Sequence, residues 1–112
     1  MCSGKIYFDL LERRQKEKRD DIALIRVEQL YPFPEKMLEK ILSGYDNVSQ
    51  YIWCQEEPKN QGAWFSSQHH IRNIISGAEL KYAGRPFSAA PAVGYAALHL
   101  KQLRTLIDEV FS

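Results

Sequence analysis

Segments with a helical pattern and short apolar, strand-like segments alternate along the whole chain. Apolar residues recur at helical spacing over residues 6–19, 34–43, 60–77 and about 95–110. Strand-like apolar runs lie between them, at residues 22–27, 51–55 and 80–84. Parallel strands need a long crossover connection, which is usually a helix, so this order predicts an α/β fold with a mostly parallel sheet and helices on both faces.

The size and charge of the chain bound its function. A chain of 112 residues with 45% hydrophobic residues predicts one domain, residues 1–112, with one modest core. The net charge of +1 argues against a nucleic-acid partner or a membrane surface, which both need a basic excess. No apolar run reaches the roughly 20 residues of a membrane span. The opening stretch MCSGKIYFDL lacks the apolar core of a signal peptide.

Apolar spacing also predicts which side chains are buried. Two cysteines do not make a disulfide framework, so both are expected to be buried thiols in a reducing compartment. The residues expected to face the core from the last three helical segments are Met37, Leu38, Ile41, Leu42, Trp64, Ile71, Ile74, Ile75, Leu100, Leu103, Ile107 and Val110.

The first helical segment begins almost at once, although a helix of this fold should follow a strand. Only Met1 and Cys2 precede the turn at Ser3. We therefore expect a fragment of a larger protein, in which the first strand or strands are truncated.

Two short patterns could bind a ligand, and each has a plainer reading. The stretch Ser3–Lys5 resembles part of a phosphate loop, but the full G-x-x-x-x-G-K-[ST] pattern is absent and a simple strand-to-helix turn is favoured. His69 and His70 are adjacent, so on a helix they point about 100° apart and do not form an i, i+4 metal pair. His99 is remote in sequence, and no metal is expected.

The stretch QEEPKNQGAW, residues 55–64, follows a strand and raises the possibility of paired catalytic carboxylates. Ligands and partners of an open parallel sheet meet the carboxyl ends of its strands, where this stretch and the loop of residues 84–94 both lie. Glu56 and Glu57 are strand neighbours and should point to opposite faces, which argues against an acid–base pair. One of them is expected to bind backbone or to pair with Arg85. Structural or interface roles therefore outweigh catalytic ones here.

Four stretches in this order and spacing resemble the C-terminal end of one family: CSGKIYFDLLERR, IALIRVEQLYPFP, WCQEEPKNQGAW and YAGRPFSAAPAVG. The family is the thiamine-diphosphate-dependent decarboxylating component of 2-oxoglutarate dehydrogenase, of bacterial type. The resemblance covers nearly all of this chain and only a small last portion of the family enzyme. It implies a three-layer transketolase C-terminal-domain fold with a mixed five-stranded sheet, in which a strand ending at Cys2 lies between those at 22–27 and 51–55.

The resemblance also implies a parent activity, the oxidative decarboxylation of 2-oxoglutarate with succinyl transfer to lipoyl groups in the tricarboxylic acid cycle. Thiamine diphosphate and magnesium would lie in the preceding domains, so no catalytic, cofactor or metal residue is expected in this chain. The expected partners are those domains, the dimer mate and, indirectly, the lipoyl-bearing second component. The location would be the bacterial cytoplasm, or the mitochondrial matrix in a eukaryote. The residues expected at the interface are Glu56, Glu57, Asn60, Gln61, Trp64 and Arg85.

A regulatory reading remains open beside the interface reading. A nucleotide or an acyl-CoA could bind at the border of the domain, with phosphate or amide contacts from Arg85, Lys81 and Gln61.

Overall fold

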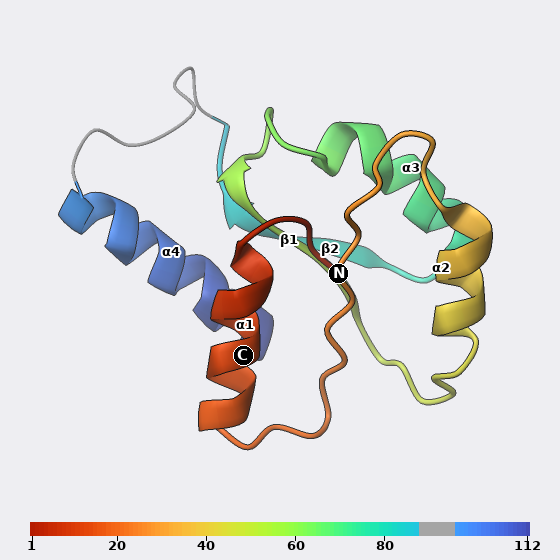
Figure 1. Cartoon of the computed structure of the whole chain (residues 1–112), viewed down its shortest axis with the longest axis horizontal. Coiled ribbons are helices and arrows are strands. Elements are labelled where there is room, and N and C mark those ends of the chain that lie inside the picture. The colour runs from red at the N-terminus through yellow and green to blue at the C-terminus, as the bar shows by residue number, and fades with distance from the viewer. Residues whose placement is uncertain (88–95) are drawn as a thin grey trace.

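The computed structural model describes residues 1–87 and 96–112. Its elements follow one another in the predicted order, without the strand expected at residues 22–27 (Figure 1). They are α1 (Ile6–Lys16), α2 (Glu35–Leu42), β1 (Tyr51–Pro58), α3 (Trp64–Ile75), β2 (Leu80–Arg85) and α4 (Ala96–Phe111). β1 and β2 pair in parallel, so the α/β class is confirmed. Most of the expected loop of residues 85–94, and the expected helix start at Tyr95, lie outside the described residues.

The first two residues lie inside the sheet. Cys2 forms parallel bridges to Arg26 on one side and to Cys54 of β1 on the other. The Cys2 N–H donates to the Ile25 carbonyl at 3.0 Å, and the Cys54 N–H donates to the Met1 carbonyl at 2.9 Å. This position between residues 22–27 and β1 is the one that the family resemblance implies.

The strand expected at residues 22–27 is reduced to a single bridge at Arg26. A strand is defined by its ladder partner, and here that partner consists of Met1 and Cys2, which give Arg26 one pairing position. The described residues form two strands and two bridges instead of the five strands that the resemblance implies.

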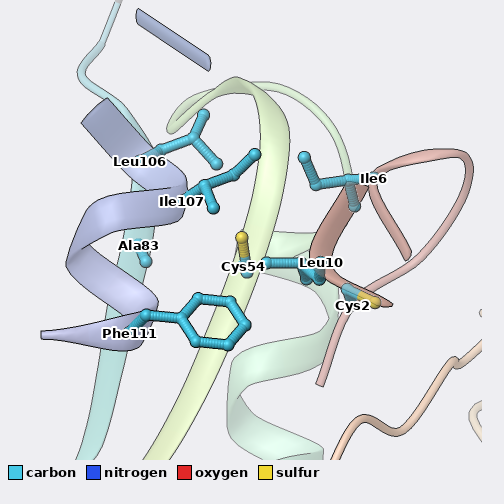
Figure 2. Close-up of a cluster of buried hydrophobic side chains, with 8 residues drawn as sticks. All are labelled: Cys2, Ile6, Leu10, Cys54, Ala83, Leu106, Ile107 and Phe111. Atoms are coloured by element: carbon cyan, nitrogen blue, oxygen red, sulfur yellow. The ribbon is translucent and has the colours of Figure 1, made fainter. Parts of the chain in front are cut away.

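Helices lie on both sides of the sheet, α1 and α4 on one side and α2 and α3 on the other (Figure 1). The adjacent strand residues Trp53 and Cys54 point to opposite faces and belong to different cores. The core on the α1–α4 side (Figure 2) consists of Cys2, Ile6, Leu10, Cys54, Ala83, Leu106, Ile107 and Phe111. The core on the α2–α3 side consists of Val27, Phe33, Leu38, Trp53, Ala63, Trp64, Ile71 and Leu80.

Three side chains predicted to be buried are exposed. On α2, Leu38 faces the core, but Met37 and Ile41 are 66% and 41% exposed. On α4, Leu100 is 58% exposed, whereas Leu106, which the pattern did not single out, is buried. A helix buries only the stripe that meets a neighbour, and apolar spacing alone does not show which of two adjacent stripes that is.

Both cysteines are free and buried, as predicted. Burial raises the pKa of the Cys54 thiol to about 12 and also raises that of Cys2. Since the thiolate is the reactive form, these side chains act as small apolar groups of the core.

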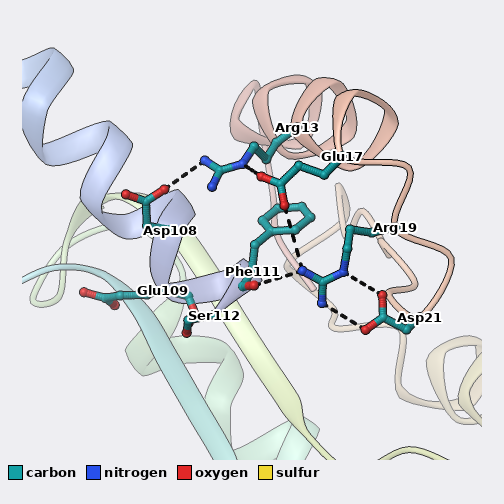
Figure 3. Close-up of polar contacts among 8 residues, drawn as sticks. All are labelled: Arg13, Glu17, Arg19, Asp21, Asp108, Glu109, Phe111 and Ser112. Carbon is teal, nitrogen blue, oxygen red and sulfur yellow. Dashed lines mark hydrogen bonds and ion pairs between the residues drawn. The ribbon is translucent and has the colours of Figure 1, made fainter.

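Arginine side chains fasten the end of α1 to the end of α4 (Figure 3). Arg13 pairs with Glu17 and reaches across to Asp108 at 2.9 Å. Arg19 pairs with Asp21 and donates from Nη1 to the Phe111 carbonyl at 3.0 Å. Both guanidinium groups also lie within 5.8 Å of the Phe111 ring centroid, in cation–π range. These contacts hold the last turn of α4 in place.

None of the helices in residues 1–87 and 96–112 is long and apolar enough to span a membrane.

Replacing Ser67 with alanine should leave the free energy of unfolding unchanged or raise it by up to about 1 kcal/mol. The Ser67 hydroxyl on α3 is buried and has no hydrogen-bond partner among the described residues, so its removal relieves a desolvation cost. Urea denaturation measures the change. Ser66→Ala is the matched control, because that exposed hydroxyl bonds the Ala63 carbonyl at 3.2 Å. A loss above about 1 kcal/mol in Ser67→Ala would show that the hydroxyl has a partner after all.

Candidate functional site

The turn after β1 is organised by one buried amide, that of Gln55, whose residue is 2% exposed. Its Nε2 donates to the carbonyls of Pro58 at 2.9 Å, Gln61 at 2.8 Å and, more weakly, Glu57 at 3.3 Å. The amide thereby links the two ends of the turn through hydrogen bonds from its buried side.

The oxygen of the same amide is also fully used. Gln55 Oε1 accepts from Trp53 Nε1 at 3.0 Å and from the Trp64 N–H at 3.1 Å, where α3 begins. The sequence analysis did not select Gln55. The signal was available, because a strand residue two positions after an inward-facing tryptophan points into the same core.

Glu56 bridges three elements at the carboxyl end of β1. Its carboxylate lies 2.9 Å from Lys5 Nζ, just before α1, and 3.0 Å from His99 Nε2, in the first turn of α4. The Glu56 side chain is only 16% exposed. A carboxylate near the first turns of two helices also meets their partial positive charge. Glu56 therefore holds the two helices of this face together.

Arg85, the arginine expected near Glu56 and Glu57, contacts the main chain of β1. Arg85 Nε donates to the backbone carbonyl of Glu56 at 2.7 Å, while the Glu56 carboxylate binds Lys5 and His99. Arg85 is 7% exposed, and from this buried place its Nε reaches the main chain of β1. The guanidinium therefore joins the two strands through backbone.

The anion-binding groups of the turn at Ser3–Lys5 contact carboxylates of the chain itself. The Gly4 N–H donates to Glu28 Oε1 at 3.0 Å, and Arg26 Nε lies 2.6 Å from the same oxygen. Both hydrogen bonds lower the pKa of Glu28, and the one from the Gly4 N–H has the larger effect. Because Lys5 is bound to Glu56, this geometry favours the plain turn over a phosphate site.

The six expected interface residues differ in accessibility. Trp64 is 4% exposed and packs in the core against Tyr82, with ring centroids 5.1 Å apart. Glu56 and Gln61 are half-buried and Arg85 is buried. Glu57 and Asn60 are exposed and can meet a neighbouring surface directly.

Two exposed aromatic rings come from the same end of the sheet as Glu57 and Asn60. Phe65 lies in the first turn of α3 and is 51% exposed, and Phe87 follows β2 and is 60% exposed. Their ring centroids are 5.7 Å apart. We call Glu57, Asn60, Phe65 and Phe87 the carboxyl-edge surface.

The three residues of the regulatory reading are not brought together. Lys81 and Arg85 lie four residues apart on β2, about 13 Å in an extended strand. Exposed Lys81 borders a pocket of about 260 Å³ with Gln50 and Glu109, and neither Arg85 nor Gln61 lines it. Nucleotide or acyl-CoA binding stays a prediction, and calorimetric titration of adenine nucleotides and acetyl-CoA tests it.

The three histidines lie in different settings. His70 Nδ1 is 3.0 Å from Glu35 Oε1, and its ring stacks on Phe33. His69 is exposed beside it, and His99 binds Glu56. Within residues 1–87 and 96–112, no three His, Cys, Asp or Glu side chains are grouped so as to hold a metal ion.

Replacing Glu56 with glutamine should lower the free energy of unfolding by about 1 kcal/mol, because partly exposed ion pairs contribute little more than that. The loss should be smaller in high salt, because salt already screens the attraction between Glu56 and Lys5 in the original protein. Chemical denaturation at low and high ionic strength measures both effects. Glu57→Gln, at the exposed neighbouring carboxylate, is the matched control with an expected change below about 0.5 kcal/mol.

These features define a class: an α/β domain with a parallel sheet, in which most polar groups at the carboxyl edge are bound to the domain's own elements. The family model described as "2-oxoglutarate dehydrogenase C-terminal" matches residues 1–111. The chain belongs to this family.

Similar proteins agree with this assignment. The 2-oxoglutarate dehydrogenase E1 component of Haemophilus influenzae is 54% identical over 113 residues, and that of Azotobacter vinelandii is 52% identical over 116. Both matches cover 100% of this chain and 12% of the relative. The E1 component of Coxiella burnetii is 51% identical over 97% of this chain and 12% of the relative. The chain thus spans about an eighth of the length of these relatives.

Proposed function

We propose that this chain is a docking domain of a 2-oxoglutarate dehydrogenase decarboxylating component and performs no chemistry itself. The parent protein would oxidatively decarboxylate 2-oxoglutarate and transfer the succinyl group to lipoyl groups of the second component. The domain would support the remaining domains of that protein and its dimer mate. The bacterial relatives support a cytoplasmic location in a bacterium.

One observation carries this proposal: the polar groups of residues 55–64 that could serve catalysis are used within the domain. The Gln55 amide has partners on both its oxygen and its nitrogen, and the Glu56 carboxylate is held by Lys5 and His99. Glu57 and Asn60 are exposed on the same turn, at the end of the sheet that also carries the exposed rings of Phe65 and Phe87. A polar rim around aromatic side chains is typical of a protein–protein interface.

The described residues, 1–87 and 96–112, do not fit thiamine diphosphate and magnesium. The described part offers no grouped metal ligands, and its turn at Ser3–Lys5 contacts Glu28 and Glu56. The proposal therefore assigns the cofactor and the metal ion to the remaining domains of the parent protein.

In the full-length polypeptide that carries this sequence, Glu57→Ala with Asn60→Ala should weaken docking and spare substrate binding. The melting temperature should fall by about 2–4 °C, the shift that about 1 kcal/mol produces in a larger domain. The Michaelis constant for 2-oxoglutarate should stay within about twofold, because these residues would not touch the substrate. Scanning calorimetry, sedimentation velocity and steady-state kinetics measure these quantities.

The matched control is Glu79→Ala with Asn73→Ala, which changes the same exposed residue types at the opposite end of the strands. It should leave the melting temperature unchanged. A raised Michaelis constant with unchanged stability in Glu57→Ala with Asn60→Ala would favour a substrate role for this surface and overturn the docking proposal.

A further inference from the structure

A second apolar surface lies on α2, away from the carboxyl-edge surface. Met37, Ile41 and Tyr45 follow one another at four-residue spacing and are 66%, 41% and 47% exposed. Residues four apart lie on the same face of a helix, and the backbone bonds of Gly44 and Tyr45 to Ile41 and Leu42 continue the helical path past its end. We call these three side chains the outer α2 face.

The apolar side of α2 is wider than the part that the domain itself covers. Leu38, which is 2% exposed, and Leu42 pack against the core. Met37 and Ile41 continue the same apolar side but are exposed. This uncovered part is therefore suited to a second packing partner.

The surroundings of the outer α2 face indicate what kind of partner this is. Exposed Lys36, Glu39 and Lys40 form the charged side of α2, which borders these apolar residues, and supply both signs of charge. An apolar centre with a mixed charged rim is typical of a protein interface, whereas a membrane surface selects a basic excess.

The length of the similar proteins indicates where a partner would come from. This chain covers 12% of the relatives to which it is similar, so most of their polypeptide lies outside it. A domain tethered in the same chain is present at millimolar effective concentration, far above that of a separate molecule. Resting on the proposed function, we propose that another domain of the same polypeptide covers the outer α2 face through an apolar patch.

Oxidation of Met37 in the full-length polypeptide tests whether the face is covered. Thioether oxidation by hydrogen peroxide follows exposure, so a covered Met37 should oxidise at least about tenfold more slowly in the native protein than in the same protein unfolded in guanidinium. Peptide mass spectrometry reads the rate. Native oxidation at close to the unfolded rate would show an uncovered face and overturn the inference.

A photo-crosslinking residue identifies the partner. With p-benzoylphenylalanine at position 41 of the full-length polypeptide, irradiation should link this domain to another domain of the same chain. The product should then run as a single chain on a denaturing gel, with the linked peptide identified by mass spectrometry. A product of two chains, or no crosslink, would overturn the inference.

Substitutions at the two surfaces separate this inference from the proposed function. Met37→Glu with Ile41→Glu should lower the melting temperature of the full-length protein, and Met37→Leu with Ile41→Leu, which keeps the face apolar, should not. If the glutamates have no effect while Glu57→Ala with Asn60→Ala still weakens docking, the outer α2 face is not an interface and the proposed function stands. If only the outer α2 face responds, the docking role of the carboxyl-edge surface fails instead.

Discussion

Replacing Gln55 with glutamate should lower the free energy of unfolding by about 3–5 kcal/mol at neutral pH, the range for an uncompensated buried charge. The substitution is nearly isosteric, so packing is retained. It replaces the Nε2 donor, which serves the carbonyls of Pro58 and Gln61, with an ionised oxygen that those carbonyls repel. The bonds accepted from Trp53 Nε1 and the Trp64 N–H survive.

The loss should be smaller at pH 5 than at pH 8, because a protonated carboxyl regains one O–H donor for a carbonyl. Urea denaturation at both pH values measures this difference. Gln15→Glu, at an exposed position of α1, is the control and should change stability by less than about 0.5 kcal/mol. Equal effects of the two substitutions would show that the turn does not depend on the Gln55 amide.

Replacing Gly84 with alanine should lower the free energy of unfolding by about 2 kcal/mol or more, as overpacking of a well-packed site does. A methyl group at Gly84 would lie 2.5 Å from the Tyr82 hydroxyl oxygen and 2.8 Å from the Gln55 carbonyl oxygen. The Tyr82 hydroxyl donates to the Arg85 carbonyl at 2.8 Å and is not free to move away without losing that bond. Burial raises the pKa of Tyr82 to about 12, so the hydroxyl remains a donor at neutral pH.

Two further variants test this explanation. Gly44→Ala is the matched control, because its methyl group would meet only the Ile41 carbonyl, at 3.4 Å. Tyr82→Phe removes the 2.5 Å contact with the hydroxyl oxygen and keeps the ring carbon Cζ at 2.7 Å, so Gly84→Ala should cost less in that background than in the original chain. Thermal or urea unfolding of the original chain, the two single variants and the double variant measures this coupling. A cost that is independent of the Tyr82 hydroxyl would place the strain at the ring carbon and the Gln55 carbonyl instead.

Local sequence pattern predicted the type and order of the six elements that form, and it wrongly predicted a further strand at residues 22–27. Helical spacing located α1, α2, α3 and α4, and short apolar runs located β1 and β2, because both periodicities follow from backbone geometry over a few residues. The family resemblance placed Cys2 between the residues near Arg26 and β1, and the two bridges confirm it.

Partner choice at the carboxyl edge required the tertiary structure. Glu56 binds Lys5 and His99, which are 51 and 43 residues away, whereas the sequence suggested only backbone or Arg85 as the partner of one of the two glutamates. The sequence around Glu56 does not show which helices begin close to the end of β1. The distance between such groups is set only when both helices pack on the same face of the sheet.

The sequence by itself determined the α/β class, the elements, and the family to which the chain belongs. Only the tertiary structure decided that Gln55 is the centre of the turn, that Trp64 lies in the domain's own core, and that Met37 and Ile41 point outward. The physical reason is that periodicity states which residues share a face, whereas burial depends on which neighbour meets that face, and the neighbour comes from a distant part of the chain.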